Sequence, residues 1–143
     1  MKRDEFLSRR KLVQYAGVVA AGACGGCGGP GGTEQPTGPV AAGNVSALSV
    51  GALRIVEFVV IGRDAGGVYA MSNICTHAGC PMEAAGTQLA CGCHGSIFDR
   101  NGEVVRGPAR RPLPHFRVDV ATDGTMTVQQ DAVVDASART PVT

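Results

Sequence analysis

Apolar and polar residues alternate in short runs along most of the chain, and no stretch sustains the spacing of a helix. The clearest run is Leu113–Val120 (LPHFRVDV), in which every second residue from Phe116 onward is apolar. A two-residue period predicts a strand with one buried face, and it leaves His115 on the opposite, solvent-facing side. Leu53–Ile61 (LRIVEFVVI) is rich in β-branched residues and predicts a single buried strand.

Turn sequences separate the remaining strand candidates. Asp64–Gly67 (DAGG), Asn101-Gly102 and Asp123-Gly124 are expected to reverse the chain. The other predicted strands are short runs at Val68–Ser72, Thr87–Cys91, Ser96–Asp99, Glu103–Arg106 and Thr125–Gln129. The predicted fold is therefore all-β, a small antiparallel sandwich or barrel, with residues 73–98 inserted as a separate lobe.

The two ends of the chain depart from this pattern. Residues 24–43 are rich in Gly, Pro and Thr without periodicity, which predicts a flexible linker. Residues 131–143 are polar and are expected to fray. The folded domain is thus expected to occupy residues 44–130.

Residues 8–14 (SRRKLVQ) place paired arginines just before an apolar run, which is the arrangement of a twin-arginine export signal. The run from Leu12 to Ala23 is shorter than the ~20 apolar residues that a membrane-spanning helix needs. We therefore predict that residues 1–23 are a signal peptide and that the protein is exported to the periplasm or the extracytoplasmic face of the membrane. The alternative is an amphipathic helix that remains in the cytoplasm.

Cys24 follows Ala21-Gly22-Ala23, which resembles a bacterial lipobox although Ala21 replaces its usual leucine. The resemblance implies that Cys24 is lipidated and that the protein contacts the membrane through a lipid or N-terminal anchor. Ordinary cleavage after these small residues is the alternative. The sequence leaves the role of Cys27 open.

Composition and charge limit the class of protein. The chain of 143 residues has four Phe, two Tyr and no Trp, so its core should be small and should need a metal or a disulfide. Without residues 1–23, eight Arg remain beside ten Asp and Glu, and no Lys is left. A net charge of −2 argues against a nucleic-acid partner, which requires a basic surface.

Residues 75–96 contain four cysteines and two histidines, more ligands than one tetrahedral ion binds. A structural zinc site would use four of the six side chains and leave two over. A disulfide framework without metal suits an exported protein but leaves the histidines unexplained. A two-iron cluster held by two Cys and two His is the third interpretation, and two loops that each supply one Cys and one His satisfy it.

Residues 75–80 (CTHAGC) and 91–96 (CGCHGS) resemble the two sequence boxes of high-potential Rieske iron–sulfur proteins. Gly107-Pro108-Ala109 is similar to the proline loop that shields the cluster in this family. The resemblance covers roughly residues 50–130 and implies one [2Fe–2S] cluster per chain.

The resemblance also implies a role for each side chain of the boxes. Cys75 and Cys91 would bind the buried iron, and His77 and His94 the outer iron. Cys80 and Cys93 would form the disulfide that ties the two loops together in the respiratory branch of the family. Low-potential Rieske ferredoxins and ring-hydroxylating oxygenases lack that pair.

Three further positions bear on the cluster by resemblance. Ser96 lies where family members place a hydroxyl that donates to a bridging sulfide. Phe98 lies where quinol-oxidising members usually have Tyr, so one hydrogen bond is absent and we expect a lower reduction potential. Arg110 and Arg111 follow the proline loop where the family pattern has another Pro at 110, and they are candidates for contact with an acidic partner.

The expected function is one-electron transfer outside the cytoplasmic membrane, because nothing in the sequence supplies a catalytic acid, a nucleophile or a substrate pocket. The first hypothesis is the iron–sulfur subunit of a quinol–cytochrome c (bc1-type) complex, with quinol, cytochrome b and a c-type cytochrome as partners. The second is a free-standing periplasmic Rieske lipoprotein or the small subunit of an arsenite-oxidase-like enzyme. A structural zinc module is a remote third.

Overall fold

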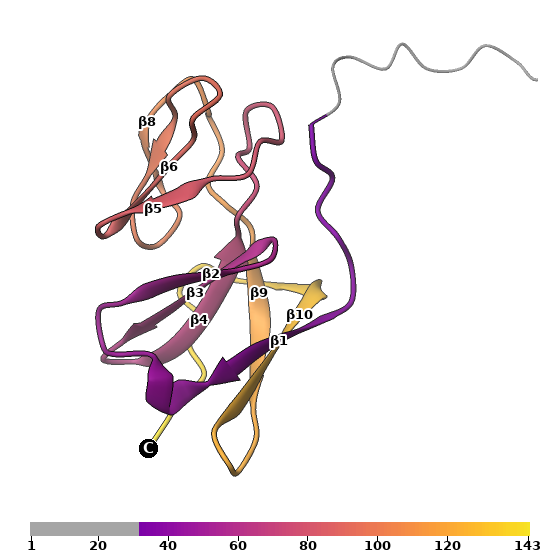
Figure 1. Ribbon diagram of the computed structural model, residues 1–143, viewed down its shortest axis with the longest axis vertical. Helices are drawn as coiled ribbons and strands as arrows, with labels where there is room; N and C mark the ends of the chain where they lie inside the picture. The colour runs from indigo at the N-terminus through magenta and orange to yellow at the C-terminus, as the bar shows by residue number, and fades with distance from the viewer. Residues whose placement is uncertain (1–31) are drawn as a thin grey trace, which may run out of the picture.

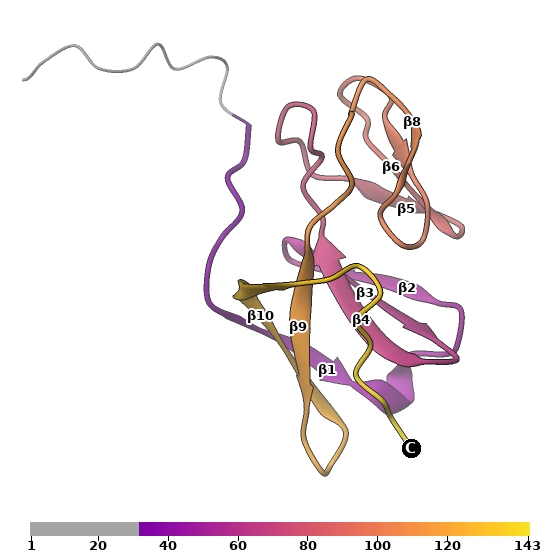
Figure 2. The same ribbon diagram turned by 180° about the vertical axis from the view of Figure 1, so that it is seen from behind.

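Two antiparallel sheets lie one above the other in the computed structural model, which describes residues 32–143 (Figures 1 and 2). The elements, in chain order, are β1 (Pro39–Asn44), the 3-10 turn η1 (Val45–Ala47), β2 (Leu53–Val56), β3 (Val59–Asp64), β4 (Gly67–Ser72), β5 (Glu83–Ala85), β6 (Gln88–Ala90), β7 (Ile97–Phe98), β8 (Val104–Arg106), β9 (His115–Val120) and β10 (Thr125–Val134). The all-β prediction is confirmed, since every strand pair is antiparallel. The predicted signal peptide, Cys24 and Cys27 lie outside the described residues.

The larger sheet forms the base of the domain and has the strand order β1-β10-β9-β4-β3-β2. The smaller sheet, β5-β6-β7-β8, forms the lobe above it (Figure 1). The lobe is longer than the predicted insertion of residues 73–98, because β8 pairs with β7 and brings residues 104–106 into it. The chain enters the lobe after β4 and returns from it into β9 (Figure 1).

The apolar run Leu53–Ile61 is two strands rather than the single strand that we predicted. The chain reverses between Val56 and Val59, which are paired across the β2–β3 hairpin. Glu57 sits in this turn with φ of 52°, and its exposed polar side chain interrupts the apolar run. One polar residue in a left-handed turn conformation is a weak sequence signal beside six β-branched or aromatic neighbours.

Strand β4 is buried along its whole length because it separates two apolar cores. Val68 and Ala70 face the core of the base sheet, together with Ile61 and Val128. Tyr69 and Met71 face the opposite core, which lies between the base and the lobe. A strand covered on both faces carries a continuous apolar run instead of an alternating one.

His115 is buried with 2% of its surface exposed, so its predicted place on a solvent-facing side is wrong. It begins β9 opposite Met71 of β4, where the lobe covers the outer face of the base sheet. Farther along β9 the lobe no longer covers that face, and Arg117 and Asp119 are exposed as the alternation predicts. A period of two therefore identified the strand but not the second layer above its first residue.

Residues 39–43, predicted as part of a flexible linker, instead form most of β1. This strand pairs with β10, where Val40 lies opposite Val128. Val40 and Ala42 are buried in the base core. The segment forms a strand because its alternating apolar residues pack into the base core and its backbone pairs with β10 at the edge of the sheet. The glycine and proline around these residues concealed the strand in the sequence.

Residues 131–143 are ordered against the base and are not the frayed tail that we predicted. β10 continues to Val134 after an irregularity in its pairing with β9. Beyond it, the backbones of Thr140 and Val68 exchange two hydrogen bonds of 2.9 Å. The guanidinium of Arg139 forms a 2.6 Å ion pair with Asp64, which secures the segment.

No helix among the described residues is both long and apolar enough to cross a membrane.

Candidate metal centre

Three loops meet at one end of the lobe and carry the side chains that the sequence singled out. They are residues 75–80 after β4, residues 91–96 between β6 and β7, and residues 107–112 after β8. The amide of Ala109 donates to the hydroxyl of Ser96 across 3.0 Å, and the Thr76 hydroxyl donates to the carbonyl of Arg111 across 2.6 Å. The third loop is thereby fixed to each of the other two.

The two cysteine boxes fold into the same turn. In each, the amide of the fifth residue donates to the carbonyl of the first, at 2.9 Å for Gly79 to Cys75 and 3.0 Å for Gly95 to Cys91. Both glycines have positive φ, 74° and 78°, a conformation that other residues adopt only with strain. The glycine at this position of each box therefore explains why two different hexapeptides fold alike.

Cys75 and Cys91 are buried at the base of these turns, with 2% and 3% of their surfaces exposed, and neither forms a disulfide. Burial raises the pKa of the Cys75 thiol, the backbone N–H of His77 lowers it, the adjacent Cys91 raises it, and the Ser96 hydroxyl lowers it. The net effect is a raised pKa. The Cys75 thiol therefore lies next to that of Cys91, and the His77 amide and the Ser96 hydroxyl are directed at Cys75.

His77 and His94 lie at the outer side of the same two turns, and both side chains are exposed. Their ring centroids are 4.9 Å apart and the rings meet edge to face at 86°. Each loop thus contributes one buried sulfur donor and one exposed nitrogen donor. This set of two Cys and two His is the one that a Rieske [2Fe–2S] cluster requires.

A disulfide joins Cys80 to Cys93, as the resemblance implied. The sulfur atoms of Cys80, Cys91 and Cys93 all lie within 4.8 Å of one another. These three do not form a metal site, because two of them are bonded to each other and no longer offer thiolates. Of the six candidate ligands in residues 75–96, four remain free to bind metal.

The other predicted site residues surround the free thiols. Ser96 is fully buried, and its oxygen accepts from Ala109, so its proton remains available for a sulfur acceptor. Phe98 is fully buried in the same apolar cluster as Cys75 and Cys91. Gly107 and Pro108 are exposed at the rim of the third loop.

Two contacts at the cluster end were not anticipated from the sequence. Arg106, the last residue of β8, donates from Nε to the carbonyl of Gly95, next to His94, across 3.1 Å. Thr76 connects the first loop to the third through its bond to Arg111. Neither the arginine at the end of a strand nor the threonine in a loop belongs to a sequence pattern that would predict its contact.

The N-terminal strap, residues 32–38, runs beside the first loop before the chain enters β1 (Figures 1 and 2). The Thr33 amide donates to the Gly79 carbonyl across 2.8 Å. A Cβ atom added to Gly32 would lie 2.2 Å from the Ala78 carbonyl oxygen, so only glycine allows this approach. Strap and loop border a cleft of about 450 Å³ that includes His94.

Gln35 fixes the strap to the base sheet. Its amide nitrogen donates to the side-chain oxygen of the buried Gln130 across 2.6 Å, and its amide oxygen accepts from the Ser72 hydroxyl at 2.5 Å. Both partners lie in strands of the base, β10 and β4. The predicted linker is therefore bound to the domain from Gly32 onward.

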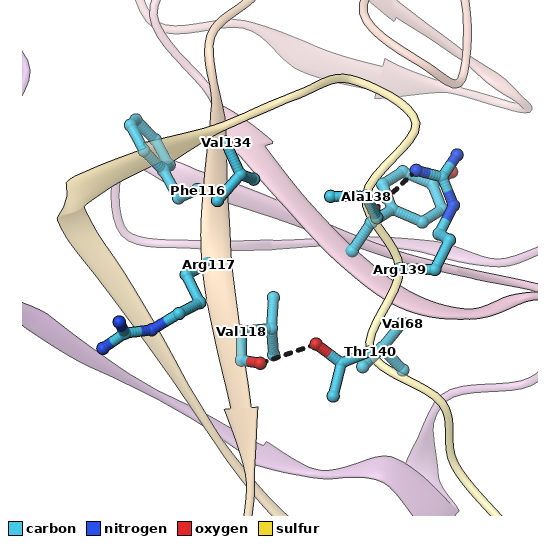
Figure 3. A pocket seen from close by; sticks show the side chains of 9 residues that line it. Val68, Phe116, Arg117, Val118, Val134, Ala138, Arg139 and Thr140 are labelled. Carbon is cyan, nitrogen blue, oxygen red and sulfur yellow. Dashed lines mark hydrogen bonds between the residues drawn. The ribbon is translucent and has the colours of Figure 1, made fainter.

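A separate cleft of about 220 Å³ lies on the base, between β4, β9 and the C-terminal segment (Figure 3). Thr140 bridges it by donating to the Val118 carbonyl across 2.7 Å. The hydroxyl of Tyr69 donates to the Arg100 carbonyl and Arg139 is paired with Asp64, so both polar side chains are engaged. None of the three loops of the metal centre lines this cleft.

Comparisons with known proteins identify the family of the domain. The sequence profile of the Rieske [2Fe-2S] domain matches residues 38–117. The cytochrome b6-f complex iron-sulfur subunit of Synechococcus sp. (strain CC9605) is 42% identical over 73 residues, which are 50% of this chain and 41% of that protein. The subunit of the same name from Prochlorococcus marinus (strain MIT 9215) is 37% identical over 75 residues, covering 42% of its length. The chain thus spans less than half of these relatives.

Solved structures give the same fold. The cyanobacterial plasma membrane Rieske protein from Synechocystis PCC 6803 superimposes with a TM-score of 0.52 and 26% identity, over 63% of this chain and 98% of that one. A chain from the complex of oxygenase and ferredoxin in carbazole 1,9a-dioxygenase also gives a TM-score of 0.52, over 70% of this chain and 100% of that one. At 22% identity, the second likeness concerns the fold alone.

Proposed function

Since the chain belongs to the Rieske [2Fe–2S] domain family, and is thus an electron-transfer protein that binds a [2Fe–2S] cluster, we propose that Cys75, Cys91, His77 and His94 hold that cluster. The main support is the pairing of two buried, unbonded cysteines with two exposed imidazoles on loops joined by a disulfide. The cysteines would bind the inner iron and the histidines the outer iron.

The bound cluster supplies a one-electron redox centre. The protein's own residues hold it and control access to it. Phe98 and Ser96 are fully buried beside the thiols and exclude water from the sulfur side. The exposed histidines give the partner its shortest approach, because all other donors are buried.

We assign the protein to the extracytoplasmic face of the membrane, as the iron–sulfur subunit of a quinol–cytochrome c complex. The curated relatives support this assignment, since they are named subunits of cytochrome b6-f complexes. The disulfide supports an oxidising compartment, because such bonds persist outside the cytoplasm. Quinol, a b-type cytochrome and a c-type cytochrome would then be its partners.

A free-standing lipoprotein carrier, or the small subunit of an arsenite-oxidase-like enzyme, is the second candidate. It is favoured by the likeness to the Synechocystis structure, which is named a plasma membrane Rieske protein rather than a subunit of a complex. Twin-arginine export and lipidation of Cys24 are compatible with either candidate and do not distinguish them. Cell fractionation and mass spectrometry of the mature N-terminus would test both processes.

Electron paramagnetic resonance tests the ligand set. The reduced protein should give the low average g-value of a cluster with mixed nitrogen and sulfur ligands. His77→Ser and His94→Ser should each abolish that signal, whereas His115→Asn should retain it because His115 lies outside the loops. Zinc in place of iron, or an unchanged signal in both ligand variants, would refute the assignment.

Co-purification separates the two candidate roles. A tagged chain isolated in mild detergent should bring with it b- and c-type haems in stoichiometric amounts if it is a complex subunit. Isolation as a lipidated protein without haem would favour the free carrier.

A further inference from the structure

Three arginines lie in or beside the third loop, which is bonded to the two loops that carry His77 and His94, and they will be called the arginine rim: Arg106, Arg110 and Arg111. All three are exposed. Arg106 lies against Gly95, beside His94, through its 3.1 Å bond to the carbonyl. Arg111 is held next to the first loop, because its carbonyl accepts from Thr76, the neighbour of His77.

Arg110 is the third member of the rim and precedes Arg111 in the chain. It directly follows Ala109, whose amide is bound to the hydroxyl of Ser96 in the second loop. The backbone around the three arginines is therefore fixed to both cysteine loops. The arginines therefore lie at the same end of the protein as His77 and His94, and their side chains are exposed there.

The rim is not neutralised within the part of the chain that the structure describes. The ion pairs there are those of Arg117 with Asp119 and Arg139 with Asp64, both in the base or its C-terminal segment. Two of the three acidic residues of the lobe, Asp99 and Glu103, lie in the β7–β8 turn, at the opposite end of that hairpin from the loops. The third, Glu83, lies at the loop end of β5, opposite Ala90, and forms none of these ion pairs.

Charge is also divided between the two layers of the protein. Residues 73–114 contain four Arg and three acidic residues, whereas the rest of residues 32–143 contain four Arg and seven acidic residues. Residues 73–114 thus carry a net charge of +1 and the rest of residues 32–143 a net charge of −3, to which Glu34 of the strap contributes. Such a dipole orients the protein as it approaches a charged surface, and it raises the rate of productive encounters.

We propose that the arginine rim is the docking surface for an electron-transfer partner that presents carboxylates around its own redox site. This inference rests on the proposed function, since it names the chemistry of the partner that meets the histidines. The contact is weak and fast, because exposed ion pairs add little affinity but steer association strongly at low salt.

Reagents of opposite charge test the sign of the field at the cluster end. The reduced full-length protein gives one electron to ferricyanide, an anion, or to tris(phenanthroline)cobalt(III), a cation. In the double variant Arg110→Gln/Arg111→Gln we expect the rate with ferricyanide at low salt to fall about threefold to tenfold. The rate with the cobalt complex should rise, and both differences should vanish above roughly 0.5 M salt.

Single substitutions provide the matched control. Arg117 is exposed like the rim arginines, but it lies on β9 in the base and is paired with Asp119. Arg117→Gln removes the same charge as Arg111→Gln and should leave both rates unchanged. Equal effects of the two variants would show that only net charge matters, and would overturn the proposal.

A binding assay without electron transfer distinguishes the partner class. Fluorescein-labelled octaglutamate should bind the oxidised protein in low salt, with at least about fivefold weaker binding in the double variant. Vesicles containing phosphatidylserine test the alternative that the rim binds a lipid surface. Binding to vesicles that depends on the rim, without binding to the peptide, would overturn the proposal in favour of a lipid surface.

The cluster signal of each variant separates this inference from the proposed function. The double variant leaves the contact of Arg106 with Gly95 intact, so it should keep its electron paramagnetic resonance spectrum. A normal spectrum with unchanged rates and unchanged peptide binding refutes the rim alone. A wild-type protein that never holds a [2Fe–2S] cluster refutes the proposed function.

Discussion

Cys80 and Cys93 are joined across the two cysteine loops, with their Cα atoms 6.5 Å apart. Each cysteine belongs to the loop that carries one of the two exposed histidines, His77 or His94. The bond therefore connects the two halves of the metal centre directly, in a lobe whose sheet has strands of only two or three residues.

Removing this bond should destabilise the lobe. The loop that it closes spans 13 residues, for which the loss of chain entropy in the unfolded state is worth about 3 kcal/mol. We expect Cys80→Ser/Cys93→Ser to lower the free energy of unfolding by about that amount in denaturant titrations. The visible spectrum should also fade sooner than in the wild type, and equal unfolding midpoints would contradict the expectation.

The N-terminal strap should detach when Gly32 acquires a side chain. Gly32→Val places a Cβ atom 2.2 Å from the Ala78 carbonyl oxygen, whereas the β1 pairing with β10 begins farther along, at Pro39. Hydrogen exchange of residues 32–38 should become at least about fivefold faster, while that of β1 stays the same.

Thr33→Val is the control for this experiment. It introduces the same side chain one residue later, at an exposed position, and leaves the backbone bond from residue 33 to Gly79 in place. Exchange that is as fast in this variant as in Gly32→Val would mean that the strap does not depend on the close approach.

Arg139 should contribute more to stability than any exposed arginine of the base. Its guanidinium pairs with Asp64 at 2.6 Å, donates to Asn101 across 2.7 Å and lies 4.0 Å from the ring centroid of Tyr69. Arg139→Ala removes all three contacts and should lower the free energy of unfolding by about 2 kcal/mol.

Arg117→Ala is the control variant, because it shows how much unfolding free energy is lost when an exposed arginine is removed. Arg117 and Asp119 are 57% and 51% exposed, and such pairs contribute about 0.5 kcal/mol or less. Thermal unfolding of the two variants under the same conditions should therefore differ clearly. Similar midpoints would show that the C-terminal segment is not secured by Arg139.

His115 should make the fold sensitive to acid. Burial is the main cause of its lowered pKa; the Leu113 carbonyl opposes the shift, Arg139 adds to it, and Glu103 and Asp135 weakly oppose it. The carbonyl accepts from Nδ1, and Nε2 has no hydrogen-bond partner within residues 32–143, so the ring is held neutral. The unfolded chain then binds a proton more readily than the folded one.

The sign of the pH effect follows from this difference. Stability from His115 is fully present above the unfolded pKa, about 6.5, and is lost as the pH falls from there toward the folded pKa. Denaturant titrations at pH 8 to 5 should show a weaker decline in His115→Asn than in the wild type. An identical decline in both proteins would assign the effect to other groups.

Phe98 should lower the reduction potential relative to a tyrosine at the same position. It is fully buried in the cluster of residues that contains both free cysteines, and its ring has no donor. Phe98→Tyr adds one hydrogen bond of about 1 kcal/mol, equivalent to roughly 40 mV for one electron. Voltammetry should show that rise, with no rise in Phe98→Leu, and an unchanged midpoint in the tyrosine variant would contradict it.

The sequence predicted most strands and turns because their signals are local. Alternation identified β9, and the pairs Asn101-Gly102 and Asp123-Gly124 identified two turns whose glycines have φ of 78° and 83°. The disulfide also followed from the sequence, through the resemblance of its boxes to a known family. The prediction of a single strand over Leu53–Ile61 was wrong, because Glu57 forms a turn that the sequence signals only weakly.

The sequence by itself determined the chemistry of the centre, because a pair of boxes with Cys, His and Gly at set spacings is recognisable without coordinates. Tertiary structure alone decided what covers and surrounds it. The strap, the C-terminal segment, the burial of His115 and the arginine rim all depend on contacts between residues that are far apart in the chain. Gly32 contacts Gly79 and Arg139 is paired with Asp64, although these residues are 47 and 75 positions apart, and Arg106 contacts Gly95 across the β7–β8 hairpin. Such contacts arise when the layers pack together, and neighbouring residues in the sequence do not reveal them. Composition therefore predicted that residues 32–38 and 131–143 are flexible, although the fold binds both segments.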